Sequence, residues 1–172
     1  MKAVILSVRP KWCASMANGE KTLEVRKNKP NLQTPFKCYI YETFGKMHWA
    51  DIPIPKDQGG GYIRDKIRDG GKVIGEFVCD DATLLTAAHY RYIEKYACVS
   101  VHDIKNYMGI KEGLELTYLD GCYGWHISNL KMYDKPLPIS DFTQLRNTKF
   151  GAEPVALKRP PQSWCYVEEQ GG

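Results

Sequence analysis

Short apolar segments, most of them bounded by proline or glycine, are the feature that most limits how this 172-residue chain can fold. The first, at 2–8, is followed by Pro10, which fixes its own φ and is tolerated in the first turn of a helix. Similar runs recur at 36–42, 72–79 and 122–128. Runs of this length and composition predict strands, and the first is apolar enough to be buried on both faces.

Two short helices are predicted between these strands. Residues 11–18 follow the proline, and Gly19 can end that helix in a left-handed conformation without the steric penalty of a Cβ. The segment 81–110 is the most helical part of the chain. Its clearest helix has Ser100 as the N-cap, an acidic residue three positions later, and Gly109 at its end.

A long excursion rich in proline and glycine lies at about 43–72. Loops of this length in compact domains tend to be functional lids or mobile segments. We expect a short helix near 62–68, with Arg64, Lys66 and Arg68 as a basic face. Because two aspartates interleave with these cations, we interpret the segment as a solvated surface.

Five to seven strands with two or three short helices between them predict an α+β fold. We expect a single domain over 1–172, built as a small β-barrel or curled mixed sheet with helices at its ends. A doubly wound fold would alternate strand and helix regularly, which this chain does not do. The chain also has no Gly-x-Gly-x-x-Gly motif, no phosphate-binding lysine loop and no internal repeat.

The composition narrows the class of protein further. No apolar run is long enough to span a membrane, and the N-terminal run is too short for a secretory signal, so we expect a cytoplasmic protein. The cysteines stand singly, as is typical of reduced thiols, and the histidines lack the spacing of metal ligands, so we predict no metal and no cofactor. These residues are Cys13, Cys38, Cys79, Cys98, Cys122 and Cys165, and His48, His89, His102 and His126.

The positive charge is concentrated near the N-terminus. The whole chain carries a net charge of +4, but residues 1–40 hold eight lysines and arginines against two glutamates, a net of +6, so the remaining 132 residues sum to −2. A basic segment on a nearly neutral body indicates a partner that bears phosphate, more weakly than a high isoelectric point would.

Within this basic segment, a turn glycine is followed by three closely spaced charges. Residues 22–27 alternate apolar and polar side chains, which predicts a half-buried strand with Glu24 and Arg26 on the same face. Lys21 stands at the start of the strand, where strict alternation would send it to the other face but the turn after Gly19 can swing it toward Glu24. Either orientation of Lys21 is compatible with the pattern.

The motif Gly19-x-Lys21-x-x-Glu24-x-Arg26 follows a strand and a helix. Together with three later segments it resembles the ASCH domain family, whose fold is similar to the PUA domain of RNA-modifying proteins. The resemblance covers most of the chain, and the ending at 160–164 looks like a subgroup found in phages and gut bacteria. The excursion and the helix-rich segment are less typical parts. The later segments that carry the resemblance are 37–42, 73–77, and 123–128 with 135–137 behind it.

The resemblance implies a β-barrel with a cleft beside the Gly-x-Lys turn and a role around RNA or modified nucleosides. Some small family members look like amidohydrolases that remove the acyl group from acylated cytidine with a lysine, a threonine and a distant glutamate, and others are ribonucleases. Lys21 aligns with that lysine. The threonine position is Glu24 in this chain, and three glutamates stand as candidates for the distant one. They are Glu94, Glu112 and Glu115.

Two functions follow from these residues. As a hydrolase, the protein would use Lys21 and Glu24 as catalytic groups, which requires the pKa of Lys21 to fall from about 10.4, and the neighbouring carboxylate opposes that fall. As a binding module, it would use an ion network to place Lys21 and Arg26 against an anionic or carbonyl-bearing ligand. A surface strand with ordinary charges is the third interpretation.

Further ligand contacts are predicted from the flanking segments. Arg9 belongs to the segment that leads into the motif and adds a cation. Tyr123 and Trp125 can stack a base, as aromatic platforms do in RNA-binding modules, although aromatics in a strand more often belong to the core. His126 alternates with Trp125 and is expected at the core or its rim. The predicted partner is RNA or a nucleotide or nucleoside, with no membrane.

Overall fold

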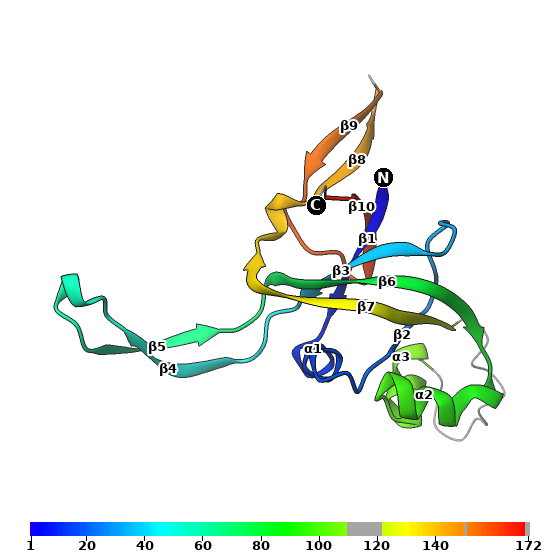
Figure 1. Ribbon diagram of the computed structural model, residues 1–172, viewed down its shortest axis with the longest axis horizontal. Coiled ribbons are helices and arrows are strands. Elements are labelled where there is room, and N and C mark those ends of the chain that lie inside the picture. Colours follow the sequence, from blue (N-terminus) through cyan, green and yellow to red (C-terminus); the bar gives the residue numbers. More distant parts are fainter. Residues whose placement is uncertain (110–121, 150, 171–172) are drawn as a thin grey trace.

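A six-stranded mixed sheet forms the body of the protein in the computed structural model, which describes residues 1–109, 122–149 and 151–170 (Figure 1). The strand order is β10-β1-β3-β6-β7-β2. β1 runs parallel to β3, and the other neighbours are antiparallel. The strands are β1 (Lys2–Val8), β2 (Leu23–Arg26), β3 (Phe36–Glu42), β6 (Lys72–Leu85), β7 (Cys122–Leu137) and β10 (Trp164–Glu168).

This arrangement confirms the predicted α+β class. The apolar runs at 2–8 and 36–42 form strands with the predicted bounds, whereas the runs at 72–79 and 122–128 extend into the longer β6 and β7. Within the described ranges, no pairing joins β10 to β2, so the strand pairs do not close the sheet into a barrel.

Among the described residues, three short helices pack at the sheet: α1 (Pro10–Ala17), α2 (Tyr90–Ala97) and α3 (Val101–Met108). Gly19 has φ 74° just after α1, and Ser100 caps α3 by accepting a hydrogen bond of 3.1 Å from the Asp103 amide, both as predicted. Single 3-10 turns lie at η1 (Lys56–Gln58), η2 (Ala87–His89) and η4 (Ile139–Asp141). In the described part of the chain, no helix is long and apolar enough to cross a membrane.

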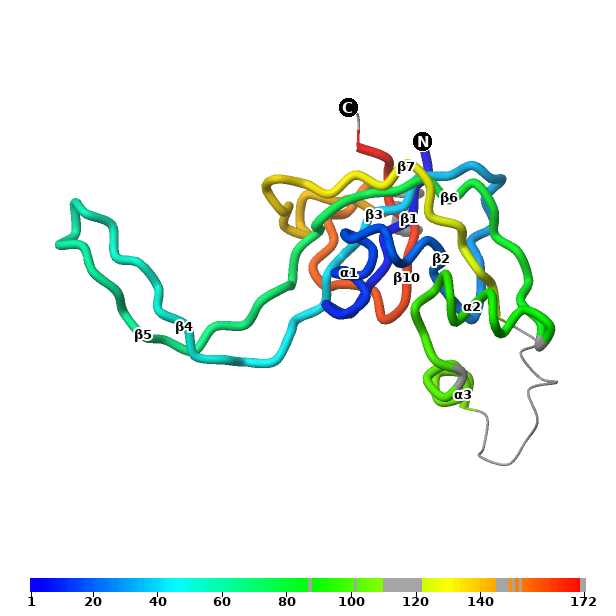
Figure 2. The backbone as a smooth tube through the Cα atoms, turned by 60° about the horizontal axis from the view of Figure 1, so that its bottom comes forward, coloured from blue at the N-terminus to red at the C-terminus, as the bar shows by residue number. Residues whose placement is uncertain are grey.

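Two hairpins extend from the sheet. One pairs β4 (Met47–Pro53) with β5 (Tyr62–Arg68) and reaches far from the body, and the other pairs β8 (Thr143–Thr148) with β9 (Gly151–Ala156) (Figures 1 and 2). The helix predicted near 62–68 is therefore wrong. The three turn glycines that precede β5 all have positive φ and reverse the chain, so β5 pairs with β4 along its whole length.

The core is divided into clusters on the sides of the sheet. One lies under α1 and contains Trp125, whose ring packs edge-on against Phe36 and Trp164. Another joins β2 to α2 and α3, where Leu23 packs with Ile93 and other apolar side chains. Each fully buried aliphatic side chain stabilises the fold by about 1.5–3 kcal/mol, so this second cluster holds the two helices against β2.

Candidate functional site

The turn after α1 brings Lys21 to the same side as Glu24. The Glu20 and Lys21 amides both donate to the Ser15 carbonyl at 3.0 Å, which fixes the turn around the left-handed glycine. The Lys21 ammonium then donates to the Leu23 and Ala97 carbonyls, each at 2.8 Å, and lies 3.1 Å from a Glu24 carboxylate oxygen. Since an ammonium has three N–H donors, all of them are used within the protein.

Glu24 joins the two cations of the motif. One of its oxygens lies 3.1 Å from Lys21 Nζ and the other 2.8 Å from an Arg26 nitrogen. The exposed fractions are 2% for Lys21, 7% for Glu24 and 6% for Arg26, so the three charges form a buried triad. The predicted shared orientation of Glu24 and Arg26 is confirmed, and the interpretation as ordinary surface charges is wrong because β2 is covered on both faces.

Burial on its own would raise the pKa of the Glu24 carboxyl, but the charges and hydrogen bonds of Lys21 and Arg26 outweigh it and hold this pKa below its ordinary value. The carboxylate is therefore ionised at neutral pH, and the triad carries a net charge of +1.

Acid should weaken the fold through this group. Because the folded-state pKa of Glu24 lies below its unfolded-state value of about 4.3, the stabilisation is fully present above that value and is lost as the pH falls through the folded-state pKa. We expect the free energy of unfolding to decrease below about pH 5, and Glu24→Gln to lessen the decrease. Urea titrations at several pH values measure both effects. If the free energy of unfolding falls equally steeply with pH in wild type and variant, the assignment is contradicted.

Arg26 ties the motif to two distant segments. Its guanidinium donates to the Ser7 carbonyl at 2.8 Å and to the carbonyl and hydroxyl oxygens of Ser163 at 3.1 and 3.2 Å. The Ser7 amide also donates to the Ser163 carbonyl, at 2.9 Å. The arginine thus joins the end of β1, β2 and the chain that enters β10, and its Nε is buried without a hydrogen-bond partner in the structure.

A cleft of about 510 Å³ opens beside the triad. Its walls come from segments that are far apart in the sequence, namely parts of 7–12, 21–26 and 99–107, with Thr43 and Gln162. α1 lies on one side of the chain that enters β2, and α2 and α3 lie on the other (Figures 1 and 2). The volume falls within the range of about 300–1,000 Å³ that is typical of small-molecule sites.

The predicted charged residues meet at this cleft, whereas the predicted aromatic residues do not. Arg9, which is exposed, lines the cleft with the triad. Trp125 has no exposed surface, so its ring has no free face for a base, and it belongs to the core. Tyr123 is half-buried, is not among the lining residues, and has Lys29 Nζ 5.6 Å from its ring centroid. The aromatic residues at the cleft are Trp12 and Tyr107.

Several polar lining residues were missed in the sequence. Asp103 and Asn106 lie on α3, where the sequence pattern indicates only a capping role for Asp103, and Gln162 lies in the ending that carries the subgroup resemblance. Their positions in the cleft depend on packing of distant segments, so only the resemblance at 160–164 signalled one of them. Of the proposed distant glutamates, Glu94 is exposed on α2 and is not among the lining residues, and the other two lie outside the described residues.

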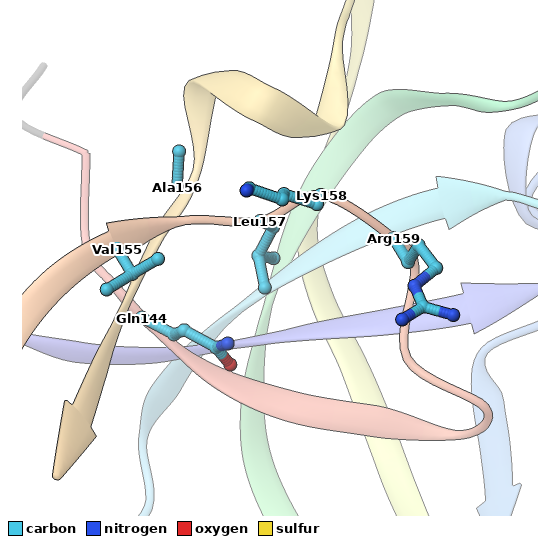
Figure 3. A pocket seen from close by; sticks show the side chains of 6 residues that line it. All are labelled: Gln144, Val155, Ala156, Leu157, Lys158 and Arg159. Carbon is cyan, nitrogen blue, oxygen red and sulfur yellow. The ribbon is translucent and has the colours of Figure 1, made fainter. Parts of the chain in front are cut away.

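Two other features, a histidine–aspartate pair and a smaller hollow, are weaker candidates for a ligand site than this cleft. The His126 ring lies 2.6 Å from an Asp80 oxygen at an exposed position, where hydrogen bonding to the ring lowers the pKa of Asp80. A smaller hollow of about 290 Å³ is lined by residues that include Lys158 and Arg159, but Figure 3 shows their charged ends directed apart. The described ranges contain no group of three or more side chains placed to hold a metal ion.

The described residues form a mixed α+β body with a buried charged triad beside a cleft. Solved structures show the same fold. One single-residue variant of ZmASCH from Zymomonas mobilis matches with a TM-score of 0.60 at 16% identity, over 98% of this chain and 92% of its own. A second single-residue variant matches with a TM-score of 0.59 at 15% identity, over 97% of this chain and 89% of its own. The ASCH structure from the same organism matches with a TM-score of 0.50 at 16% identity, over 97% of this chain and 88% of its own. No family model matches the chain, and no curated protein matches it with significance. The chain has the ASCH-domain fold.

Proposed function

We propose that the chain is a single PUA-like ASCH domain that binds RNA or a modified nucleoside in the cleft beside the buried triad. The observation that supports this most directly is the pairing of a net positive floor with a polar and aromatic rim. Trp12 and Tyr107 line the cleft with aromatic rings, each beside a cation, since Lys11 Nζ lies 4.4 Å from the Trp12 ring centroid and Lys27 Nζ 5.1 Å from that of Tyr107. Asn106 and Gln162 offer amide donors and acceptors. The exposed Arg9 offers a cation for phosphate.

Binding is favoured over covalent chemistry because the triad is already satisfied. Lys21 Nζ has three acceptors within 3.1 Å, one of them a carboxylate that stabilises the ammonium form. A nucleophilic amine needs a free lone pair, whereas all three N–H donors of the Lys21 ammonium are engaged within the protein. Each Glu24 oxygen keeps a lone-pair site that can accept a hydrogen bond from the amino group of a base.

Arg9→Gln should weaken RNA binding without affecting folding, because Arg9 is exposed and lines the cleft. For a short single-stranded RNA, we expect the slope of log affinity against log salt to fall by about 0.7, the value for one phosphate contact on a single strand. Fluorescence anisotropy over a series of salt concentrations measures this change. Lys2→Gln removes an equal charge at the far end of β1 and serves as the control. If wild type binds neither short RNA nor nucleosides, the proposal is wrong.

A hydrolase acting on acylated cytidine or RNA is the second candidate. Asp103 favours it, because this carboxylate and Glu24 line one cleft together with Lys21. Lys21→Arg tests the candidate. Arginine keeps the positive charge and should preserve binding, but it cannot transfer a proton or attack as an amine does. Turnover of acylated nucleosides or RNA by wild type, lost in Lys21→Arg, would support the hydrolase. Equal activity of wild type and the variant would exclude the lysine mechanism.

A further inference from the structure

The hairpin of β4 and β5 is an arm that projects from the body, and we call residues 47–68 the arm. Both views show it extending away from the sheet (Figures 1 and 2). Nearly all of its side chains are exposed or only half-buried, including large apolar ones. An exposed ribbon of this kind contributes little to the core, and exposed apolar residues on one element often mark an interaction site.

The strand conformation places three cations in a row. Successive side chains of a strand point to opposite faces, so Arg64, Lys66 and Arg68 share one face of β5 while Asp65 lies on the other. Neighbours in this row are about 6.8 Å apart along the strand, twice the rise per residue. The face therefore presents a regular line of positive charge, because Asp65 points to the opposite face.

Aromatic rings lie on the same face as the cations. Residues opposite each other in an antiparallel pair share a face, and Trp49 pairs with Lys66 while Tyr62 pairs with Pro53. Trp49 is 57% exposed and Tyr62 is 75% exposed. Lys66 Nζ lies 5.1 Å from the Trp49 ring centroid, so a cation and a ring are already held together.

The two faces of the arm differ in charge. On the cationic face, Asp51 stands opposite Arg64 and is the one described acid, which leaves a net charge of +2. The other face carries mainly apolar side chains, among them Ile52 and Ile63, together with Asp65 and His48. The cations and aromatic rings are thus concentrated on one side.

The base of the arm lies at the rim of the cleft. Thr43 lines the cleft, and its amide donates to the Val8 carbonyl at 2.8 Å. The two chains of the base are joined where the Gly45 amide donates to the Asp69 carbonyl at 2.9 Å. The arm therefore begins a few residues after one that lines the cleft.

We propose that the cationic face of the arm binds single-stranded nucleic acid, with phosphates against Arg64, Lys66 and Arg68 and bases stacked on Trp49 and Tyr62. A line of cations beside exposed rings is the arrangement by which proteins hold single strands. The proposal rests on the proposed function in that the bound strand continues from the cleft. A membrane surface would also be attracted by the charge and the rings, but the position of the arm at the rim of the cleft favours a strand that enters the cleft.

The triple variant Arg64→Gln, Lys66→Gln, Arg68→Gln tests the proposal with a 20-nucleotide oligouridine. We expect the slope of log affinity against log salt to fall by about 2, three contacts at about 0.7 each. The control variant Lys2→Gln, Lys135→Gln, Lys158→Gln loses the same charge at exposed positions elsewhere and should keep the wild-type slope. Trp49→Ala with Tyr62→Ala should weaken binding by about fivefold or more for each ring. Binding of mononucleosides, which require only the cleft, should be unchanged in every arm variant.

The outcomes separate the arm from the cleft. If the arm triple variant binds oligouridine like the control variant, or if wild type does not bind it, the arm proposal is overturned. If wild type binds no nucleoside but binds oligouridine through the arm, the cleft function fails and the arm proposal stands. If arm variants lose binding to phosphatidylserine vesicles while keeping oligouridine affinity, the arm is a membrane contact and the proposal is overturned.

Discussion

Replacing Glu24 by glutamine is expected to lower the free energy of unfolding by about 3–5 kcal/mol, the cost of breaking a buried ion pair from one side. The amide keeps the shape of the side chain but leaves two buried cations, Lys21 and Arg26, without their shared counter-charge. Both cations retain neutral acceptors, so the loss comes from the missing charge and not from missing hydrogen bonds alone. Urea denaturation followed by tryptophan fluorescence measures the change.

Glu20→Gln is the matched control for this experiment. Glu20 belongs to the same turn and is exposed, so its replacement should change the free energy of unfolding by no more than about 0.5 kcal/mol. A loss at Glu24 as small as that at Glu20 would mean that the triad contributes little to the fold.

Lys21→Met is expected to lower the free energy of unfolding by a similar amount, about 3–5 kcal/mol. Methionine fills much of the same volume but leaves Glu24 with one cation and removes the donor from the Leu23 and Ala97 carbonyls. Because the second of these carbonyls ends α2, the variant should also loosen that helix from β2. Thermal denaturation and hydrogen exchange of the α2 amides measure the two effects.

The stability of Lys21→Met also distinguishes the two candidate functions. A lysine kept only for catalysis can be removed at little or no cost in stability, since strained or destabilising groups are typical of active sites. Lys27→Met is the control, because Lys27 lies just beyond the triad and is exposed. If Lys21→Met is as stable as this control while activity is lost, Lys21 acts in chemistry and the structural role assigned to it is wrong.

Local patterns predicted those parts of the fold that depend on near neighbours. The strand at 2–8 follows from its β-branched and aliphatic residues, and the left-handed turn follows from Gly19, the residue with the lowest cost at positive φ. The shared face of Glu24 and Arg26 follows from the two-residue period of a strand. Each of these features depends only on residues a few positions apart in the sequence.

Features that depend on distant partners could not be predicted in this way. The sequence pattern is compatible with either orientation of Lys21, because one of its acceptors, the Ala97 carbonyl, lies 76 residues away. Trp125 could have been a platform or part of the core, and packing against Phe36 and Trp164 decided for the core. Gln162 reaches the cleft only because the chain before β10 lies against the end of β1.

The sequence by itself determined that this chain forms a mixed α+β fold with a charged motif after a glycine turn, because strand period and turn chemistry are local properties. Only the tertiary structure decided that the motif is a buried triad at a cleft, since burial comes from α2, α3 and the last segment closing over β2. The tertiary structure also decided how the three cations at 64–68 are arranged. In a helix they would spread around the axis, whereas pairing with β4 places them in one line on one face of β5. The physical reason is that charge and apolarity are carried by single residues, whereas the face on which they act is set by the partner segment.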